Sequence, residues 1–200
     1  RRILSAEGKI SMGRLKKGDL DTEGWTNLAT LQGRIDSAPL FIDDSPNMTL
    51  MEIRAKCRRL KQRNDLKLVV LDYLQLMSSG KKVESRQQEV SEFSRSLKLL
   101  AKELDVPVIA LSQLNRGSEQ RTDKRPMVSD LRESGSIEQD ADMVILLHRE
   151  DMYNPDSERV GEADMIIAKH RGGPTRTIPL AFSGKYSRFN NMANEAPPQY

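Results

Sequence analysis

Hydrophobic residues recur along the chain alternately at helical and at strand spacing, which is typical of α/β proteins. Helical spacing predicts the tail of a helix from Arg1 to Met12, stopped by Gly13, and three longer helices: residues 24–37, a helix capped by Thr49, and one that ends at Leu104. Strand-like apolar runs are 40–42, the run that leads into Asp72, 106–111 and 142–148.

Two more strands, 163–170 and 175–182, are predicted to form an antiparallel hairpin around Arg171-Gly172-Gly173-Pro174. The pattern shows no internal repeat and no second domain. We therefore expect one α/β domain over residues 1–189, with a mostly parallel central sheet and a C-terminal antiparallel hairpin. Residues 190–200 are expected to form a flexible tail.

The segment Leu66 to Met77, LKLVVLDYLQLM, contains a strand that is apolar on both faces and ends in the carboxylate of Asp72. Such strands are expected where helices cover both faces of a parallel sheet, and these sheets bind ligands beyond the carboxyl ends of their strands. Nucleotide-hydrolysing α/β proteins present a magnesium-binding acid in this way. A buried strand with a polar residue at its end explains the segment equally well, so both interpretations stay open here.

A phosphate-binding loop is missing from the sequence. Such a loop needs two glycines five residues apart, followed by Lys and by Ser or Thr. The Gly-Lys pairs of the chain lack both the upstream glycine and the following hydroxyl residue; they are Gly8-Lys9, Gly80-Lys81 and Gly184-Lys185. The chain also starts inside a helix without an initiating Met, so we expect a fragment.

Gln113 follows the strand 106–111 and would lie beside Asp72 if the two strands are neighbours. Its amide could then hydrogen-bond a terminal phosphate or the attacking water, as a phosphate sensor does. The alternative is a solvated loop glutamine. The polar segment from Ser112 to Val128 is longer than ordinary connections, which suggests a functional loop.

Lys169 and Arg171 lie two residues apart in the hairpin and are expected to share one face. Two cations near a hairpin tip suit a finger that enters the nucleotide site of an adjacent subunit, where positive charge stabilises the transferring phosphoryl group. A solvated turn is the alternative. His148 and His170 are the only histidines, and neither has the neighbours of a metal site.

Composition excludes several classes of protein. A hydrophobic fraction of 37% and a charged fraction of 30% are ordinary for a soluble globular protein, and no apolar run approaches the length of a membrane span. One cysteine, Cys57, excludes an internal disulfide and agrees with a cytoplasmic location. The net charge of +3 is too small to indicate nucleic-acid binding by itself.

Several strings together resemble the successive motifs of the bacterial replicative DNA helicases of the DnaB family. They are LVVLDYLQLM, VPVIALSQLNRGSEQR, DLRESGSIEQDADMVILLHRED and KHRGGPT, with AEGKI and APLFIDDSPNMT upstream. The resemblance covers nearly the whole chain. It implies a RecA-like three-layer ATPase domain, truncated at its N-terminal side, that uses ATP and Mg²⁺. It also implies a homo-hexameric ring that moves 5′ to 3′ on single-stranded DNA, with primase and a helicase loader as partners and no membrane contact.

The resemblance also implies roles for individual residues. Asp72 is then the magnesium-associated acid, which acts through water. Gln113 is the phosphate sensor and coupling residue, and Lys169 and Arg171 form the trans-acting finger pair. The LRESG segment matches the family's central-channel loop, whose residues that hold the single-stranded DNA backbone are Arg132, Glu133 and Gly135.

The sequence departs from the family pattern in lacking the phosphate loop, the catalytic glutamate upstream and the N-terminal domain. We therefore expect the isolated chain to be inactive and the parent protein to hydrolyse ATP and unwind DNA. Two alternatives remain: a non-catalytic module for single-strand binding or assembly, and a recombinase-type RecA-like ATPase. The segment RPMVSDLRESGSIEQDAD matches the replicative helicases better than the recombinases.

Overall fold

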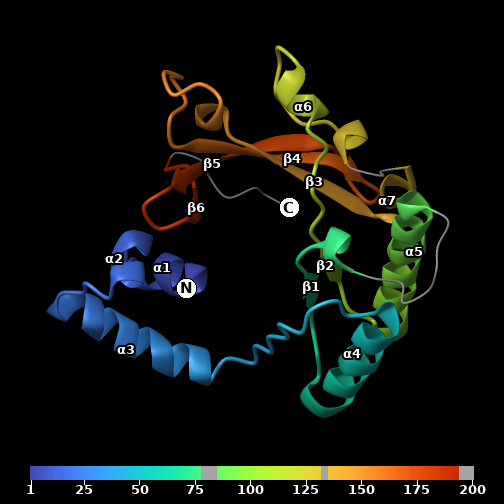
Figure 1. Ribbon diagram of the computed structural model, residues 1–200, viewed down its shortest axis with the longest axis horizontal. Helices are drawn as coiled ribbons and strands as arrows, with labels where there is room; N and C mark the ends of the chain where they lie inside the picture. Colours follow the sequence, from blue (N-terminus) through green and yellow to red (C-terminus); the bar gives the residue numbers. More distant parts are fainter. Residues whose placement is uncertain (78–84, 132–134, 194–200) are drawn as a thin grey trace. The chain divides into compact units, whose positions relative to one another are not determined.

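The computed structural model describes residues 1–77, 85–131 and 135–193, and its elements follow one another as labelled in Figure 1. The helices are α1 (Arg2–Gly8), α2 (Met12–Lys17), α3 (Thr22–Asp36), α4 (Leu50–Asn64), η1 (Leu74–Leu76), α5 (Arg86–Leu104), α6 (Gly117–Gln120), η2 (Val128–Asp130), α7 (Gly135–Asp140) and η3 (Glu150–Met152). The strands are β1 (Val69–Leu71), β2 (Val108–Ala110), β3 (Met143–His148), β4 (Glu162–His170), β5 (Arg176–Ser183) and β6 (Arg188–Asn191).

The chain divides into two compact units. Unit 1 holds Arg1–Ile42, Leu147–Ile166 and the described residues from Thr177 onward, and unit 2 holds Asp43–Leu146 and Ile167–Arg176. All the candidate site residues belong to unit 2. We expected one domain, and the division cuts through the strands β3, β4 and β5.

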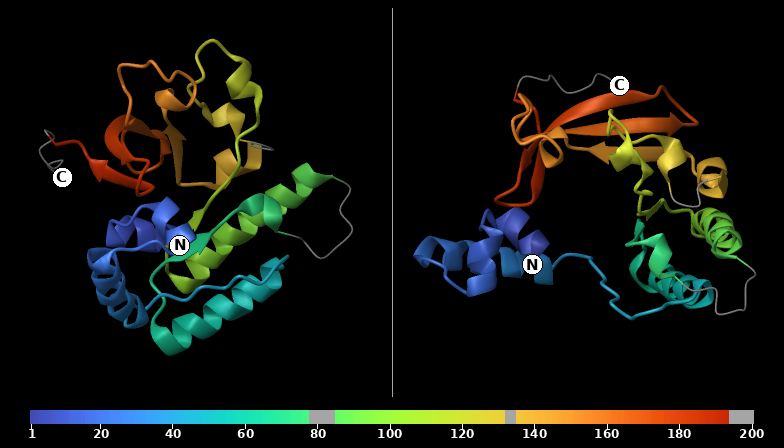
Figure 2. Two further views of the ribbon diagram at one scale, coloured as in Figure 1. Left: turned by 60° about the vertical axis from the view of Figure 1, so that its left-hand side comes forward. Right: turned by 45° about the horizontal axis from the view of Figure 1, so that its top comes forward.

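The core of unit 2 lies between α4, α5 and the sheet of β1 and β2. The two helices run side by side in Figure 2, and their apolar faces pack against Val69, Leu71 and Val108 of the two strands. The buried side chains of this core are Ile53, Cys57, Val69, Leu74, Met77, Phe93, Leu97, Leu100, Leu104 and Val106. Cys57 is thus a packing residue, and its burial raises the pKa of the thiol.

Helix α4 begins where the sequence predicted. The Thr49 hydroxyl accepts from the Glu52 backbone N–H, and the Glu52 carboxylate accepts from the Thr49 N–H, which completes a capping box. Arg54 lies 2.5 Å from the Glu103 carboxylate of α5, and Arg58 pairs with the same group. These ion pairs join the two helices that carry the core.

Strands β1 and β2 are parallel neighbours, with Val69 opposite Val108 and Leu71 opposite Ala110. The side chains of Val70 and Ile109, on the face away from the core, are 56% and 51% exposed. In the part of the chain that the structure describes, helices therefore cover one face of this sheet, whereas the continuous apolar run suggested both.

A second sheet has the order β3-β4-β5-β6. The predicted hairpin is confirmed as β4 and β5, which are consecutive and adjacent, so their short connection makes them antiparallel. The pairing of β5 with β6 is antiparallel as well. Strand β3 alternates, with Val144 and Leu146 buried between exposed neighbours, and is thus half-buried rather than buried as predicted.

Three local predictions differ from the structure. The first helix stops at Lys9 in a left-handed conformation, and a new helix starts after Ser11, whose hydroxyl accepts from the Arg14 N–H; Gly13 therefore lies inside α2 instead of ending a helix. Residues 40–42 form no strand, because a strand needs a neighbour to supply hydrogen-bond partners. Asn190 and Asn191 of the expected tail belong to β6, where they pair with β5.

The polar segment after β2 is a closed excursion rather than an open loop. An antiparallel bridge between Leu114 and Leu131 closes its base, with the Asn115 N–H 2.7 Å from the Asp130 carbonyl oxygen. We call the residues between these two leucines the excursion; it carries α6, as Figure 1 shows. Residues 78–84, whose sequence predicts a polar loop, lie outside the described residues.

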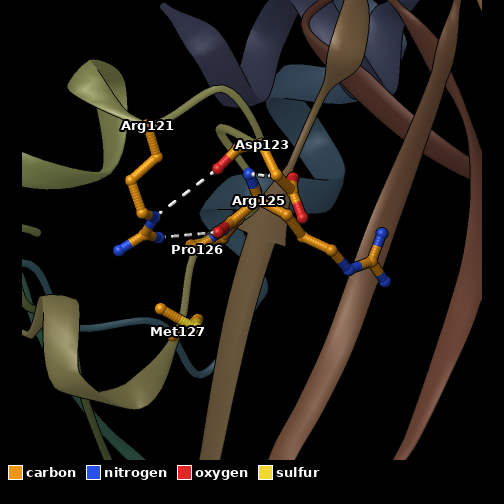
Figure 3. Close-up of a pocket in the computed structure, with 5 residues that line it drawn as sticks. All are labelled: Arg121, Asp123, Arg125, Pro126 and Met127. Carbon is orange, nitrogen blue, oxygen red and sulfur yellow. Dashed lines mark hydrogen bonds between the residues drawn. The ribbon is translucent and has the colours of Figure 1, made fainter.

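The excursion is held closed by an ion pair whose carboxylate is buried. Arg121 donates to both carboxylate oxygens of Asp130, at 2.8 and 2.6 Å, and to the carbonyl oxygen of Arg125 at 2.9 Å. These contacts border a hollow of about 430 Å³ lined by residues 121, 123 and 125–127, and the Arg125 side chain points away from Arg121 (Figure 3). Asp130 is 4% exposed, and its hydrogen bonds with Arg121 lower the pKa of its carboxyl.

None of the helices in the described residues is long and apolar enough to cross a membrane.

We predict that Arg121→Ala opens the excursion, because it leaves the buried Asp130 carboxylate without its charge partner. Amide exchange should become about tenfold faster or more at Asn115 and Met127, whose N–H groups are bonded to Asp130. Since the pKa of Asp130 is lowered, its contribution is present above the unfolded pKa of about 3.9 and is lost on acidification below it. The parent should therefore lose protection at these amides in acid.

The control Arg125→Ala, which leaves the pair intact, should keep parent protection at neutral pH. Equal exchange in the parent and in both variants contradicts the prediction.

Candidate functional site

Asp72 follows the last residue of β1, at the carboxyl edge of the parallel pair. Its side chain is exposed, and no hydrogen bond or ion pair of its carboxylate with another described residue is found. The strand places the acid at the edge where parallel sheets bind ligands, and the carboxylate is accessible there.

Gln113 stands three residues beyond the end of β2, at the same edge of the sheet. The sequence predicted that Gln113 lies near Asp72 if the two strands are neighbours. The parallel pairing of β1 with β2 shows that they are neighbours. The Leu111 N–H donates to the Leu71 carbonyl, and the Leu74 N–H donates to the Leu111 carbonyl, both at 2.9 Å. These bonds continue the pairing past the strand ends and bring the segments of Asp72 and Gln113 together.

Gln75 is a site residue that the sequence reasoning missed. Its side-chain Nε2 donates to Ser112 Oγ at 3.0 Å, and its Oε1 accepts from the Gln113 backbone N–H at 3.2 Å. The signal in the sequence was a lone amide three residues after Asp72, inside an otherwise apolar run. The spacing of apolar residues cannot show that this amide links the segments that follow two strands, because it carries no information on which strands are neighbours.

Lys169, in β4, and Arg171, in the turn after it, both reach the C-terminal end of α7 in the same chain. Lys169 Nζ donates to the carbonyl oxygen of Glu138, and Arg171 Nη2 donates to that of Gln139 at 2.7 Å. The last carbonyls of a helix have no partner inside it and carry partial negative charge, so they attract cations. Both side chains therefore lie against this helix end.

Asp142 supplies a second contact for Arg171. Its carbonyl oxygen accepts from the Arg171 backbone N–H at 2.9 Å, and its carboxylate lies 3.6 Å from the guanidinium. The hydrogen bond from Lys98, and then the charges of Arg171 and Lys169, hold the pKa of this carboxyl below its usual value. Three cations thus gather at the end of α7 around one carboxylate.

The proposed DNA segment borders elements that the structure describes. Arg132 and Glu133 lie outside the described residues, and Gly135 is the exposed first residue of α7. Helix α7 packs on α5, where Ser91 Oγ and Ser136 Oγ are 2.9 Å apart. The excursion ends at Leu131, directly before Arg132.

Asp72 supplies one exposed carboxylate at this edge of the sheet. No group of three or more His, Cys, Asp or Glu side chains able to hold a metal occurs in residues 1–77, 85–131 and 135–193. Mg²⁺ at phosphate sites commonly takes one or two carboxylates and completes its shell with water and phosphate oxygens. Asp72 can supply the carboxylate in such a shell.

Comparison with known proteins extends these observations. The family described as DnaB-like helicase C terminal domain matches residues 1–191. The chain is 70% identical over 192 residues to the replicative DNA helicase DnaB of Leifsonia xyli subsp. xyli, and these residues make up 96% of this chain and 42% of that protein. Its identity to the DnaB of Geobacillus stearothermophilus is 56%, with the same shares. The chain thus spans less than half the length of these curated relatives.

Two solved structures share the fold, each with a TM-score of 0.91 and 44% identity over 96% of this chain. One is described as an ATPase domain, of which 69% is covered. The other is described as the structure of a DnaB-like replicative helicase and its interactions with primase, of which 48% is covered. These likenesses confirm the predicted α/β, RecA-like fold, and the chain belongs to the family of DnaB-like helicase C-terminal domains.

Proposed function

We propose that the chain is part of the motor of a replicative DNA helicase, which hydrolyses ATP to move 5′ to 3′ along single-stranded DNA and unwinds duplex at the replication fork. The observation that carries the proposal is the parallel pairing of β1 with β2, because it brings an exposed acid and a glutamine to one sheet edge in a DnaB-like fold. The 200 residues contain no phosphate loop, so the activity belongs to a longer protein that supplies one.

Asp72 would hold Mg²⁺ at the carboxyl edge of the sheet, through water. Bound Mg²⁺ offsets the negative charge that the phosphates carry. Gln113 follows the neighbouring strand at the same edge of the sheet, and its exposed side chain would hydrogen-bond the terminal phosphate or the attacking water. The acid and the amide therefore act on the same nucleotide.

Lys169 and Arg171 complete the site of an adjacent subunit in a homo-hexameric ring. Their contacts with the α7 carbonyls hold both charged groups at the C-terminal end of that helix. The carbonyls there are neutral groups, whereas the Asp142 carboxylate balances part of the charge of Arg171.

Single-stranded DNA is held by Arg132 together with backbone N–H groups around Glu133 and Gly135. An arginine and backbone donors bind phosphate oxygens without reading bases, and a translocating motor needs such a sequence-independent contact. The Glu133 carboxylate would repel phosphate, so its contribution is backbone donation or pairing with a basic neighbour.

The excursion connects the nucleotide site with the proposed DNA segment. Gln113 is bonded to Leu114, and Arg132 is bonded to Leu131, while Leu114 and Leu131 are bridged to each other. A displacement of Gln113 at the nucleotide therefore reaches Arg132 through one strand bridge.

In the full-length protein, primase and a helicase loader are the expected partners, and the cytoplasm is the expected location.

We predict that Asp72→Asn in the full-length protein abolishes ATP hydrolysis and leaves the fold intact, because the change is nearly isosteric and removes the charge that Mg²⁺ needs. Steady-state ATPase rates and the thermal unfolding midpoint measure the two effects. The matched control is Asp65→Asn, the same substitution in the segment that precedes β1. Asp65 has a left-handed backbone conformation, which asparagine tolerates. Normal turnover in Asp72→Asn removes this residue from the site.

We predict that Arg171→Ala lowers kcat by about 10³-fold or more, the usual contribution of an arginine finger. If the finger acts in trans, mixing this variant with a subunit that is dead in its phosphate loop restores part of the activity, since some interfaces then combine the two intact halves. A finger that acts in cis gives no recovery. Arg176→Ala, an exposed arginine on the other arm of the hairpin, should keep parent activity.

We predict that Arg132→Ala weakens single-strand binding about equally for all sequences. Each lost phosphate contact should reduce the slope of log K against log salt by about 0.7. DNA-stimulated ATPase should fall with binding, whereas basal ATPase should change less. Arg116→Ala, a change at an exposed arginine of the excursion, serves as the control. Parent values of binding, slope and stimulation in Arg132→Ala would leave the LRESG segment as an ordinary connection.

A further inference from the structure

Gln75 joins the segments that follow the two parallel strands. Its amide nitrogen donates to Ser112 Oγ, its amide oxygen accepts from the Gln113 N–H, and its own backbone carbonyl accepts from Arg86 Nη2 at 2.9 Å. The side chain is half-buried, so water competes with these bonds less than at an exposed position. A single residue in the segment after β1 therefore fixes the backbone beyond the end of β2.

The backbone that carries Gln75 is itself anchored in the core of unit 2. Leu74, its neighbour in η1, is 2% exposed and donates its N–H to the Leu111 carbonyl. Arg86 also donates to the Met77 carbonyl at 3.2 Å and pairs with Glu89, and its guanidinium lies 5.8 Å from the centre of the Phe93 ring. The Gln75 amide thus starts from a fixed point.

Gln113, by contrast, is fixed at its backbone and exposed at its side chain. Its N–H is bonded to Gln75, its next residue is held in the bridge with Leu131, and no hydrogen bond of its side chain with the described residues is found. The direction in which the Gln113 side chain leaves the sheet edge therefore depends on where its backbone N–H is held.

We infer that Gln75 is a positioning residue for Gln113: its amide holds the Gln113 backbone so that the Gln113 side chain faces the nucleotide. The inference rests on the proposed role of Gln113 as phosphate sensor. A misplacement of about 1 Å in a reacting group can cost about 100-fold in rate, so a single hydrogen bond at this point has a large effect on turnover.

The test uses the full-length protein with Gln75→Met, which keeps the length and most of the volume of the side chain and removes both amide bonds. We expect the DNA-stimulated kcat to fall about 10- to 100-fold, with the KM for ATP changed less than about threefold. Ser112→Ala removes one of the two side-chain bonds and should cause a smaller fall. The control Gln88→Met changes an exposed glutamine of α5 and should retain parent values.

A double-mutant cycle separates positioning from a general structural role. If Gln75 acts through the Gln113 side chain, Gln75→Met should lower kcat less than about twofold in a Gln113→Ala background. An equal fall in both backgrounds overturns the inference, because Gln75 would then act independently of Gln113. Should Gln75→Met fail to assemble, Gln75→Asn, whose amide is one methylene shorter, breaks the same contacts and is read in the same way.

The outcomes also distinguish the inference from the proposed function. Parent turnover in Gln75→Met, with loss of turnover in Gln113→Ala, overturns the inference and leaves the sensor role standing. Parent turnover in Gln113→Ala overturns the sensor role and the inference with it. Loss in both single variants without a further loss in the double variant supports both.

Discussion

The parallel pairing of β1 with β2 is the constraint on which the site depends. Its register, with Leu71 opposite Ala110, ends both strands at one edge, so the residues that follow them share that edge. The pairing is held from one side by the apolar faces of α4 and α5 and beyond the strand ends by the Leu74 and Leu111 amides. A shift of the register by one residue would exchange the buried and exposed faces of β1 and move Asp72 relative to Gln113.

Polar contacts of unit 2 extend this constraint to the rest of the site. The Gln75 amide continues the pairing to Gln113, the Leu114–Leu131 bridge continues it to the residue before Arg132, and the Arg121–Asp130 pair keeps the excursion closed. Each of these contacts is a direct bond or ion pair between residues whose backbones are themselves held by hydrogen bonds. The strand ends and Leu131, the residue before the proposed DNA segment, are therefore joined by direct backbone and side-chain contacts.

The sequence predicted those features that depend on local pattern. The Thr49 cap, the long helix that ends at Leu104 and the β4–β5 hairpin follow from capping chemistry and periodicity, and the structure has them. The absence of a strand at residues 40–42, the half-burial of β3 and the contacts of Gln75 depend on which segments are neighbours, and periodicity does not contain that information. Excursion residues such as Asp130 look like ordinary loop residues until the fold buries them.

Helix α7 has a position that periodicity also could not show. Its first residue, Gly135, belongs to the segment proposed to hold DNA, and its last carbonyls hold Lys169 and Arg171. Its 6 residues cannot bend much, because each turn is closed by backbone hydrogen bonds, so a displacement at one end moves the other. Under the proposed function, DNA at Gly135 and the charges offered to the neighbouring nucleotide site are linked through this helix. Linkage is reciprocal, so nucleotide that attracts the two cations alters the affinity for DNA by the same factor.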